Sequence, residues 1–133
     1  MKAATLSPGI SGEITRAPDG TYTIRVNRHD PKRRQRFTVA HELAHFLLHR
    51  DQIGNGIQDD KLYRSSLSDR REQEANRLAA DILMPPHLID AALNDAIEKD
   101  VGDRLAHLAN ELNVSEPAMS VRLETLRIDI DGA

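Results

Sequence analysis

The segment His41-Glu42-Leu43-Ala44-His45 has the pattern H-E-x-x-H and lies in a largely apolar stretch. We predict that residues 37–49 form a helix. Residues four apart share one helical face, so His41 and His45 are expected to point toward one metal ion. Glu42 projects about 100° away from His41 and is placed to act on a water at that metal. Two His ligands with a general base directly after the first are typical of zinc peptidases.

A third protein ligand is needed, because catalytic zinc sites usually have three protein ligands and a water. The extended pattern with a third His requires Gly and His where this chain has Leu48 and Asp51, so that pattern is excluded. His49 lies a full turn beyond the pair. We expect it to be a packed or hydrogen-bonded helix residue and not a ligand.

A second predicted helix, residues 70–84, offers three carboxylates: Glu72, Glu74 and Asp81. The face that contains Glu72 continues through small and apolar residues suited to close packing against the first helix. The face of Glu74 is more polar. We therefore predict Glu72 as the third ligand, with Glu74 as the alternative. Asn76, one turn after Glu72, is expected to accept the other N–H of a ligating histidine.

The first predicted helix has one apolar face, formed by Ala40, Leu43, Ala44 and Leu47. Val39, Phe46 and Leu48 add apolar surface on its other sides, so we expect the helix to be deeply buried. Before it, alternating residues around Pro18-Asp19-Gly20 predict a β-hairpin. The other predicted elements are hairpin strands at 12–17 and 21–27, a basic loop at 28–36, a loop at 51–69, helices at 87–99, 103–112 and 116–127, and a frayed tail at 129–133.

The composition is that of an ordinary globular protein. The 133 residues suit one compact domain, and 39% are hydrophobic and 29% charged. A formal net charge of −3 gives no argument for a nucleic-acid or membrane partner. The chain has no Cys, so disulfides and thiolate zinc sites are excluded. There is no signal-peptide pattern and no run of 18 apolar residues. We expect a cytoplasmic protein without a membrane span.

Three segments together resemble the ImmA/IrrE family of metallo-endopeptidases. They are Arg36–His45 (RFTVAHELAH), Glu72–Pro85 (EQEANRLAADILMP) and Asn113–Leu123 (NVSEPAMSVRL). The resemblance extends from about Tyr22 to Leu126. The order and spacing of the three motifs are much more specific than H-E-x-x-H alone. The chain departs at Ala44, where the family usually has Gly; Ala is nearly as small and is a better helix former.

The resemblance implies a small zincin-like α+β fold, in which a short antiparallel sheet packs on the H-E-x-x-H helix and further helices follow. It implies one zinc ion per chain, with Glu72 as third ligand, and intracellular proteolysis. The substrate would be a helix-turn-helix repressor or antitoxin, in transcription regulation, stress response or toxin–antitoxin pairs. We expect residues 1–100 to form the metallopeptidase core and residues 101–128 a helical pair within the same domain.

The expected chemistry uses Glu42 as the general base, with zinc and one hydrogen-bond donor to stabilise the oxyanion. Tyr63 and His87 are the candidate donors, without support from spacing. The strand at 22–27 is a candidate edge for pairing with an extended substrate.

Two other functions stay open. One is a metal-containing regulatory module that docks a repressor without cutting it, although such a protein has no need for Glu42. The other is a DNA-binding regulator that uses the helices at 103–112 and 116–127, which have the length and turn of a helix-turn-helix. The latter is disfavoured because the second of these helices carries Glu124 beside Arg122 and Arg127, and DNA binding favours a basic face.

Overall fold

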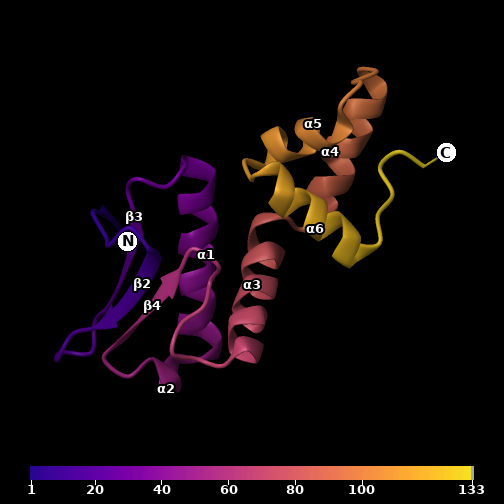
Figure 1. The fold of residues 1–133 in the computed structure, drawn as a ribbon. Coiled ribbons are helices and arrows are strands. Elements are labelled where there is room, and N and C mark those ends of the chain that lie inside the picture. The colour runs from indigo at the N-terminus through magenta and orange to yellow at the C-terminus, as the bar shows by residue number, and fades with distance from the viewer. Residues whose placement is uncertain (133) are drawn as a thin grey trace. The chain divides into compact units, whose positions relative to one another are not determined.

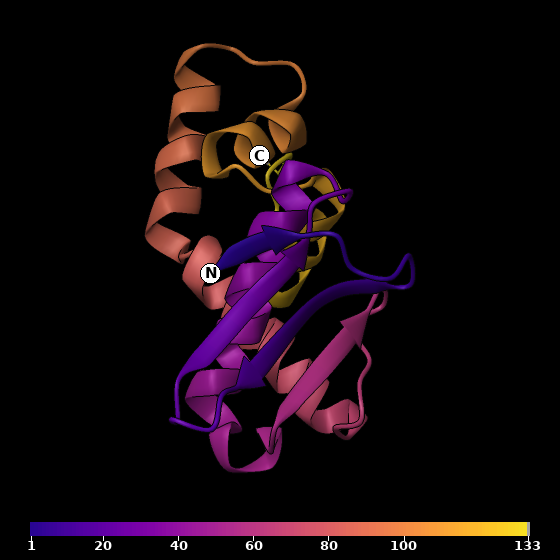
Figure 2. The same cartoon turned by 90° about the vertical axis from the view of Figure 1, so that its left-hand side faces the viewer.

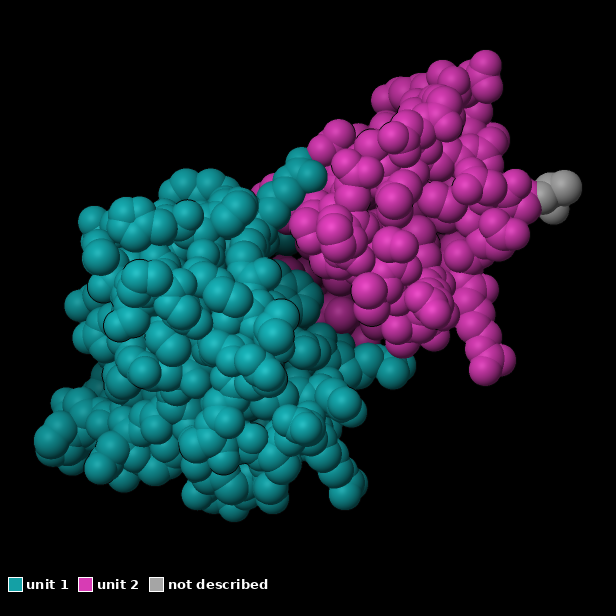
Figure 3. Space-filling model, in the orientation of Figure 1, with its two compact units in different colours: residues 1–79 teal, residues 80–133 magenta. Residues whose placement is uncertain are grey.

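The computed structural model describes residues 1–132. By their internal contacts these residues fall into two compact units, residues 1–79 and the described residues from 80 onward (Figure 3). The first unit contains a four-stranded sheet and the helix with the H-E-x-x-H segment; the second is helical (Figure 1). Helix α3 (Asp69–Leu83) begins in the first unit and ends in the second. The predicted α+β fold class is confirmed.

The sheet is built around the predicted hairpin. Strands β2 (Ile10–Arg16) and β3 (Tyr22–Asn27) are antiparallel, as expected, and Gly20 takes a positive φ of 90° in the turn between them. The short strand β1 (Lys2–Ala4) pairs parallel to β3, which gives the order β1-β3-β2-β4. β3 is therefore bonded on both sides. The expectation that it forms a free edge for a substrate is wrong, because β1 covers its second half.

Strand β4 (Gly56–Asp60) lies within the segment expected to be a loop, which corrects that prediction. It pairs antiparallel with β2 and forms one edge of the sheet. Its side chains alternate: Ile57 and Asp59 are buried, while Gln58 between them is exposed. This strand was not predicted from the sequence because one of its two buried positions carries a carboxylate in place of an apolar side chain.

Helix α1 (Lys32–Leu48) packs on β2 and β3, behind the sheet as Figure 2 shows it. It begins five residues earlier than predicted, so half of the expected basic loop is helical. The residues added, Lys, Arg and Gln, are good helix formers. The Gln35 side chain stabilises this first turn by donating hydrogen bonds to the carbonyl oxygens of Arg28 and Asp30.

The face of α1 that is buried differs from the apolar face expected. Leu43 and Leu47 are exposed, although Ala40 and Ala44 are buried. The remaining buried positions of the helix are polar, namely Gln35, Thr38, His41, Glu42 and His45. The helix therefore turns its functional residues inward, and polar partners satisfy most of them where apolar packing was expected.

The second unit is formed by the end of α3 and by α4 (Pro86–Glu98), α5 (Arg104–Leu112) and α6 (Glu116–Leu126), close to the predicted ranges. Its core is aliphatic and includes Met84, Ile89, Leu108 and Met119. Ser115 caps α6 by accepting from the Ala118 N–H, as its position in the sequence suggested. A short helix, α2 (Arg50–Ile53), follows α1 in the first unit.

By contacts, the chain divides at residue 79, whereas the division expected from sequence lay near residue 100. The difference arises because α4 packs against α5. The prediction of a frayed tail is wrong at Ile130, which is buried and whose carbonyl oxygen accepts a hydrogen bond from Arg104. Ala133 lies outside the described residues. None of the helices described has both the length and the apolar character that a membrane span requires.

Candidate metal centre

Helix α1 brings His41 and His45 together. Their Nε2 atoms are 3.1 Å apart, and both side chains are completely buried. The four-residue spacing on the helix produces this approach, as the sequence predicted. Two ring nitrogens are therefore presented to one point in the interior of the first unit.

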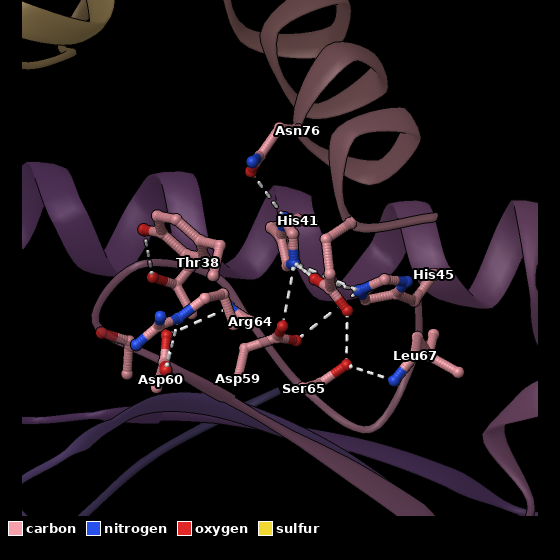
Figure 4. A network of polar contacts seen from close by, with 12 residues as sticks. Thr38, His41, His45, Asp59, Asp60, Arg64, Ser65, Leu67 and Asn76 are labelled. Atoms are coloured by element: carbon pink, nitrogen blue, oxygen red, sulfur yellow. Dashed lines mark hydrogen bonds and ion pairs between the residues drawn. The ribbon is translucent and has the colours of Figure 1, made fainter. Parts of the chain in front are cut away.

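Helix α3 adds Glu72 to the pair. Its Oε1 atom lies 2.9 Å from His41 Nε2 and 3.1 Å from His45 Nε2, and its other oxygen accepts a hydrogen bond from the Ser65 hydroxyl (Figure 4). The residue is 4% exposed. The structure thus joins the three residues that the sequence indicated as ligands.

Asn76 holds the outer side of the His41 ring, with its Oδ1 atom 2.9 Å from His41 Nδ1. Because the amide oxygen only accepts, Nδ1 carries the hydrogen and a neutral His41 has a bare lone pair on Nε2. That lone pair faces Glu72 and His45. The contact is the one expected of Asn76 from its position one turn after Glu72.

A longer chain of hydrogen bonds fixes His45. Its Nδ1 atom lies 3.0 Å from Nδ1 of His49, and Nε2 of His49 lies 2.9 Å from the Glu74 carboxylate. The carboxylate accepts from His49 Nε2–H, so the bare Nδ1 of a neutral His49 accepts from His45 Nδ1–H. His45 then also presents a lone pair on Nε2. Glu74, the alternative ligand suggested by the sequence, bonds His49 instead of joining the donor group.

Asp59 of β4 is the residue that sequence reasoning missed. It is fully buried, with Oδ1 3.4 Å from His41 Nε2 and Oδ2 3.6 Å from His45 Nε2. Together with His41, His45 and Glu72 it forms a group whose donor atoms all lie within 4.8 Å of one another. The signal in the sequence was the spacing of Ile57 and Asp59, which share one face of a strand.

Glu42 is also buried, and among the described residues neither of its oxygens has a hydrogen-bond partner; the same is true of Asp59. Burial raises the pKa of Glu42 well above its ordinary value, and the neighbouring Asp59 raises it further. Burial also favours the neutral form of Asp59, but the imidazoles of His41 and His45 outweigh burial and lower its pKa. Burial acts to lower the pKa of His45, yet Asp59 and Glu72 raise it to about 9.

The two candidate oxyanion donors, Tyr63 and His87, belong to different units of the chain. The Tyr63 ring packs 4.7 Å from the His41 ring, and its hydroxyl is 3.0 Å from Thr38 Oγ1. Thr38 donates its own hydrogen to the Arg34 carbonyl, so Tyr63 donates to Thr38 and its hydrogen is committed. His87 is exposed on α4, in the second unit.

The donor chemistry of this group fits a divalent metal ion. Two imidazole lone pairs and the carboxylates of Glu72 and Asp59 face one another, with Glu42 beside them. Buried charges of one sign are costly unless a cation or hydrogen-bond donors compensate them. Imidazole with carboxylate is a ligand set that zinc accepts.

Comparison with known proteins gives two matches. The family model described as the IrrE N-terminal-like domain matches residues 7–124. The chain is also similar to the radiation response metalloprotease IrrE of Deinococcus deserti, with 37% identity over 106 residues. The aligned part covers 73% of this chain but 36% of that protein, so the chain spans about a third of its relative's length.

Proposed function

The chain belongs to the family of the IrrE N-terminal-like domain, and on this basis we propose that it is a zinc-dependent endopeptidase. The family identified from the three sequence motifs is the one found. The observation that carries the proposal is Glu42, a buried carboxylate that follows His41 directly and lies close enough to Asp59 and Glu72 for their charges to raise its pKa. Within residues 1–132 neither of its oxygens has a hydrogen-bond partner. A relative that is named a metalloprotease supports the same activity.

In the proposed mechanism His41, His45 and Glu72 would hold the metal. A divalent ion bound there would supply a Lewis acid, which polarises a carbonyl group and lowers the pKa of a water. Glu42 removes a proton from the attacking water and delivers it to the leaving amine. Its raised pKa suits this task, because a carboxyl group that keeps a proton more readily can also return it. Neither candidate oxyanion donor gains support from its contacts, because the Tyr63 hydrogen is committed to Thr38 and His87 is exposed on α4.

We further propose that the substrate is a regulatory protein of the cytoplasm, a helix-turn-helix repressor or an antitoxin. The name of the Deinococcus relative, a radiation response protein, supports a role in stress response. Strand β4 supports binding of an extended peptide, since it is an edge strand and carries Asp59 into the site. We therefore propose β4, and not β3 as first expected, as the strand that pairs with an extended substrate.

The alternative is a metal-containing module that docks a repressor or antitoxin without cleaving it. Nothing in such a role uses Glu42, which makes it the weaker candidate. DNA binding through α6 is weaker still: Arg122 is 3% exposed and donates to Asp81 and to the Met84 carbonyl. The residues that α6 exposes are Glu116, Pro117, Ser120, Val121, Glu124 and Thr125, without a basic side chain.

The proposal is tested with Glu42→Gln. The variant keeps the size and shape of the side chain but cannot accept the proton, so cleavage should fall by about 100- to 10,000-fold while zinc content stays that of the parent. The assay incubates the purified chain with candidate helix-turn-helix proteins, beginning with any that is encoded beside its gene, and follows the fragments by mass spectrometry.

His41→Ala serves as the matched control, because it should lose both zinc and cleavage. If Glu42→Gln cleaves as fast as the parent, the mechanism is wrong. If the parent binds the partner and zinc but leaves the partner intact, the docking alternative is the correct one.

A further inference from the structure

Asp59 has an environment that the proposed reaction does not explain. Its carboxylate is fully buried, lies opposite the nitrogens of both histidines, and has no hydrogen-bond partner on either oxygen within residues 1–132. A buried carboxylate without hydrogen bonds is destabilising unless a positive charge beside it, on a protonated imidazole or a bound cation, compensates it. Neutral imidazoles cannot supply that charge, so beside neutral histidines the surroundings of Asp59 point to a bound cation.

The hydrogens on the two histidines point away from Asp59. Asn76 takes the hydrogen of His41 Nδ1 and His49 that of His45 Nδ1, so both neutral rings turn bare nitrogens toward Asp59. Asp59 oxygens 3.4 Å from one nitrogen and 3.6 Å from the other pair with the rings when these are protonated, and repel their lone pairs when the rings are neutral. A cation among them converts each repulsion into attraction.

The two distances from Asp59 to the histidines match the edges of a tetrahedron of zinc ligands. Zinc bonds of about 2.0–2.2 Å place neighbouring tetrahedral ligands about 3.3–3.6 Å apart. Asp59 lies 3.4 and 3.6 Å from the histidine nitrogens, within this range. The separations among His41, His45 and Glu72, 2.9–3.1 Å, are shorter than the range.

Glu42 can be compared with Asp59 as a second buried carboxylate. Among the residues described, neither carboxylate has a hydrogen-bond partner, but only Asp59 belongs to the group of donors within 4.8 Å of one another. The general base therefore lies outside the ligand set, and Asp59 lies inside it.

We propose that Asp59 is a fourth protein ligand of the metal, so that the resting site is His41, His45, Glu72 and Asp59. The proposal rests on the proposed function for the presence of the metal and adds a ligand to it. Four protein ligands close a zinc site, whereas catalytic sites keep a position open. Asp59, on an edge strand, must then leave the metal or share its position before hydrolysis can begin.

Zinc affinity measured by chelator competition tests the proposal, with Asp59→Asn compared with the parent chain. Loss of an outer partner of a metal ligand costs about 10- to 100-fold in affinity, so loss of a ligand should cost more than about 100-fold. Asp60→Asn is the matched control: the next carboxylate of the same strand bonds Leu62 and Arg64, and its loss should leave zinc affinity within threefold. A fall of less than 100-fold for Asp59→Asn overturns the proposal.

A crystal structure of the zinc-loaded parent gives a second test that does not depend on whether the variant folds. An Asp59 oxygen about 2.0–2.2 Å from zinc supports the proposal, and a separation beyond 3 Å overturns it. A parent chain that fails to bind zinc contradicts the proposed function itself. A parent that binds zinc, with Asp59→Asn binding it nearly as well, contradicts only the role of Asp59.

Discussion

A histidine that binds a metal through one ring nitrogen is oriented by whatever holds the other nitrogen, because that bond fixes both tautomer and ring angle. In this chain Asn76 holds His41 and His49 holds His45. His49 is 4% exposed and is itself held by Glu74, whose pKa is lowered by this bond. We therefore regard His49 as a positioning residue for His45.

Replacement of His49 by Ala should lower zinc affinity by about 10- to 100-fold, because His45 Nδ1 loses its acceptor while all ligands remain. Chelator competition measures the affinity. His49→Gln, whose amide oxygen can accept in the same place, should recover part of the loss, and His29→Ala, which changes an exposed His, should show none. Equal zinc affinity in His49→Ala and parent would show that His49 only fills space.

The residues of the site that could be predicted from sequence are those related by helical geometry. His41 and His45 are four apart, and Glu72 was selected by the small residues on its face. Asp59 could not be found in this way, because its role depends on strand β4 lying beside α1 through pairing with β2. His49 was assigned correctly as a hydrogen-bonded residue, but its partner Glu74 comes from another helix.

At the scale of elements, the approach of strand β2 to helix α1 depends on Gly12. A Cβ atom at this position would lie 2.4 Å from Thr38 Cγ2 and 3.2 Å from Glu42 Oε2. The absence of a side chain thus lets the sheet lie directly against the general base. This also explains why the polar face of α1 is buried.

Gly12→Ala should destabilise the chain by about 1–3 kcal/mol, the usual cost of overpacking, and should reduce cleavage by displacing Glu42. Urea unfolding and the cleavage assay measure the two effects. Gly9→Ala is the matched control, since nothing lies within 4 Å of a Cβ atom there. If both variants are as stable and active as the parent, the close packing at Gly12 has no role.

The elements predicted correctly are those marked by a local sequence pattern, such as a turn or a helix cap. The hairpin has alternating residues and an Asp-Gly turn, and α6 has Ser115 as its cap. Strand β4 and the buried side of α1 were predicted wrongly for one physical reason. Both place charged or polar side chains inward at the metal centre, where an apolar pattern would otherwise mark the buried face.

At the scale of the whole molecule, the candidate ligands and the apolar core of the second unit are separate. All four donors come from residues 41–72, within the first unit, while Met84, Leu108 and Met119 belong to the core of the second. A metal bound only by the folded first unit stabilises that unit by mass action. The second unit is stabilised by aliphatic packing and by the hydrogen bonds of the buried Arg122.

Zinc should therefore slow amide hydrogen exchange in α1, β4 and the first turns of α3, and leave α5 and α6 unchanged. At a zinc concentration one hundred times the dissociation constant, the stabilisation is about 2.7 kcal/mol, which corresponds to exchange about 100-fold slower for amides that open with the first unit. Hydrogen exchange with mass spectrometry, with and without zinc, measures the difference. Magnesium is the control ion, because it prefers octahedral oxygen ligands and should give no protection. Equal protection of α5 and α6 would mean that the two units unfold as one; no protection of α1 would mean that the metal is bound elsewhere.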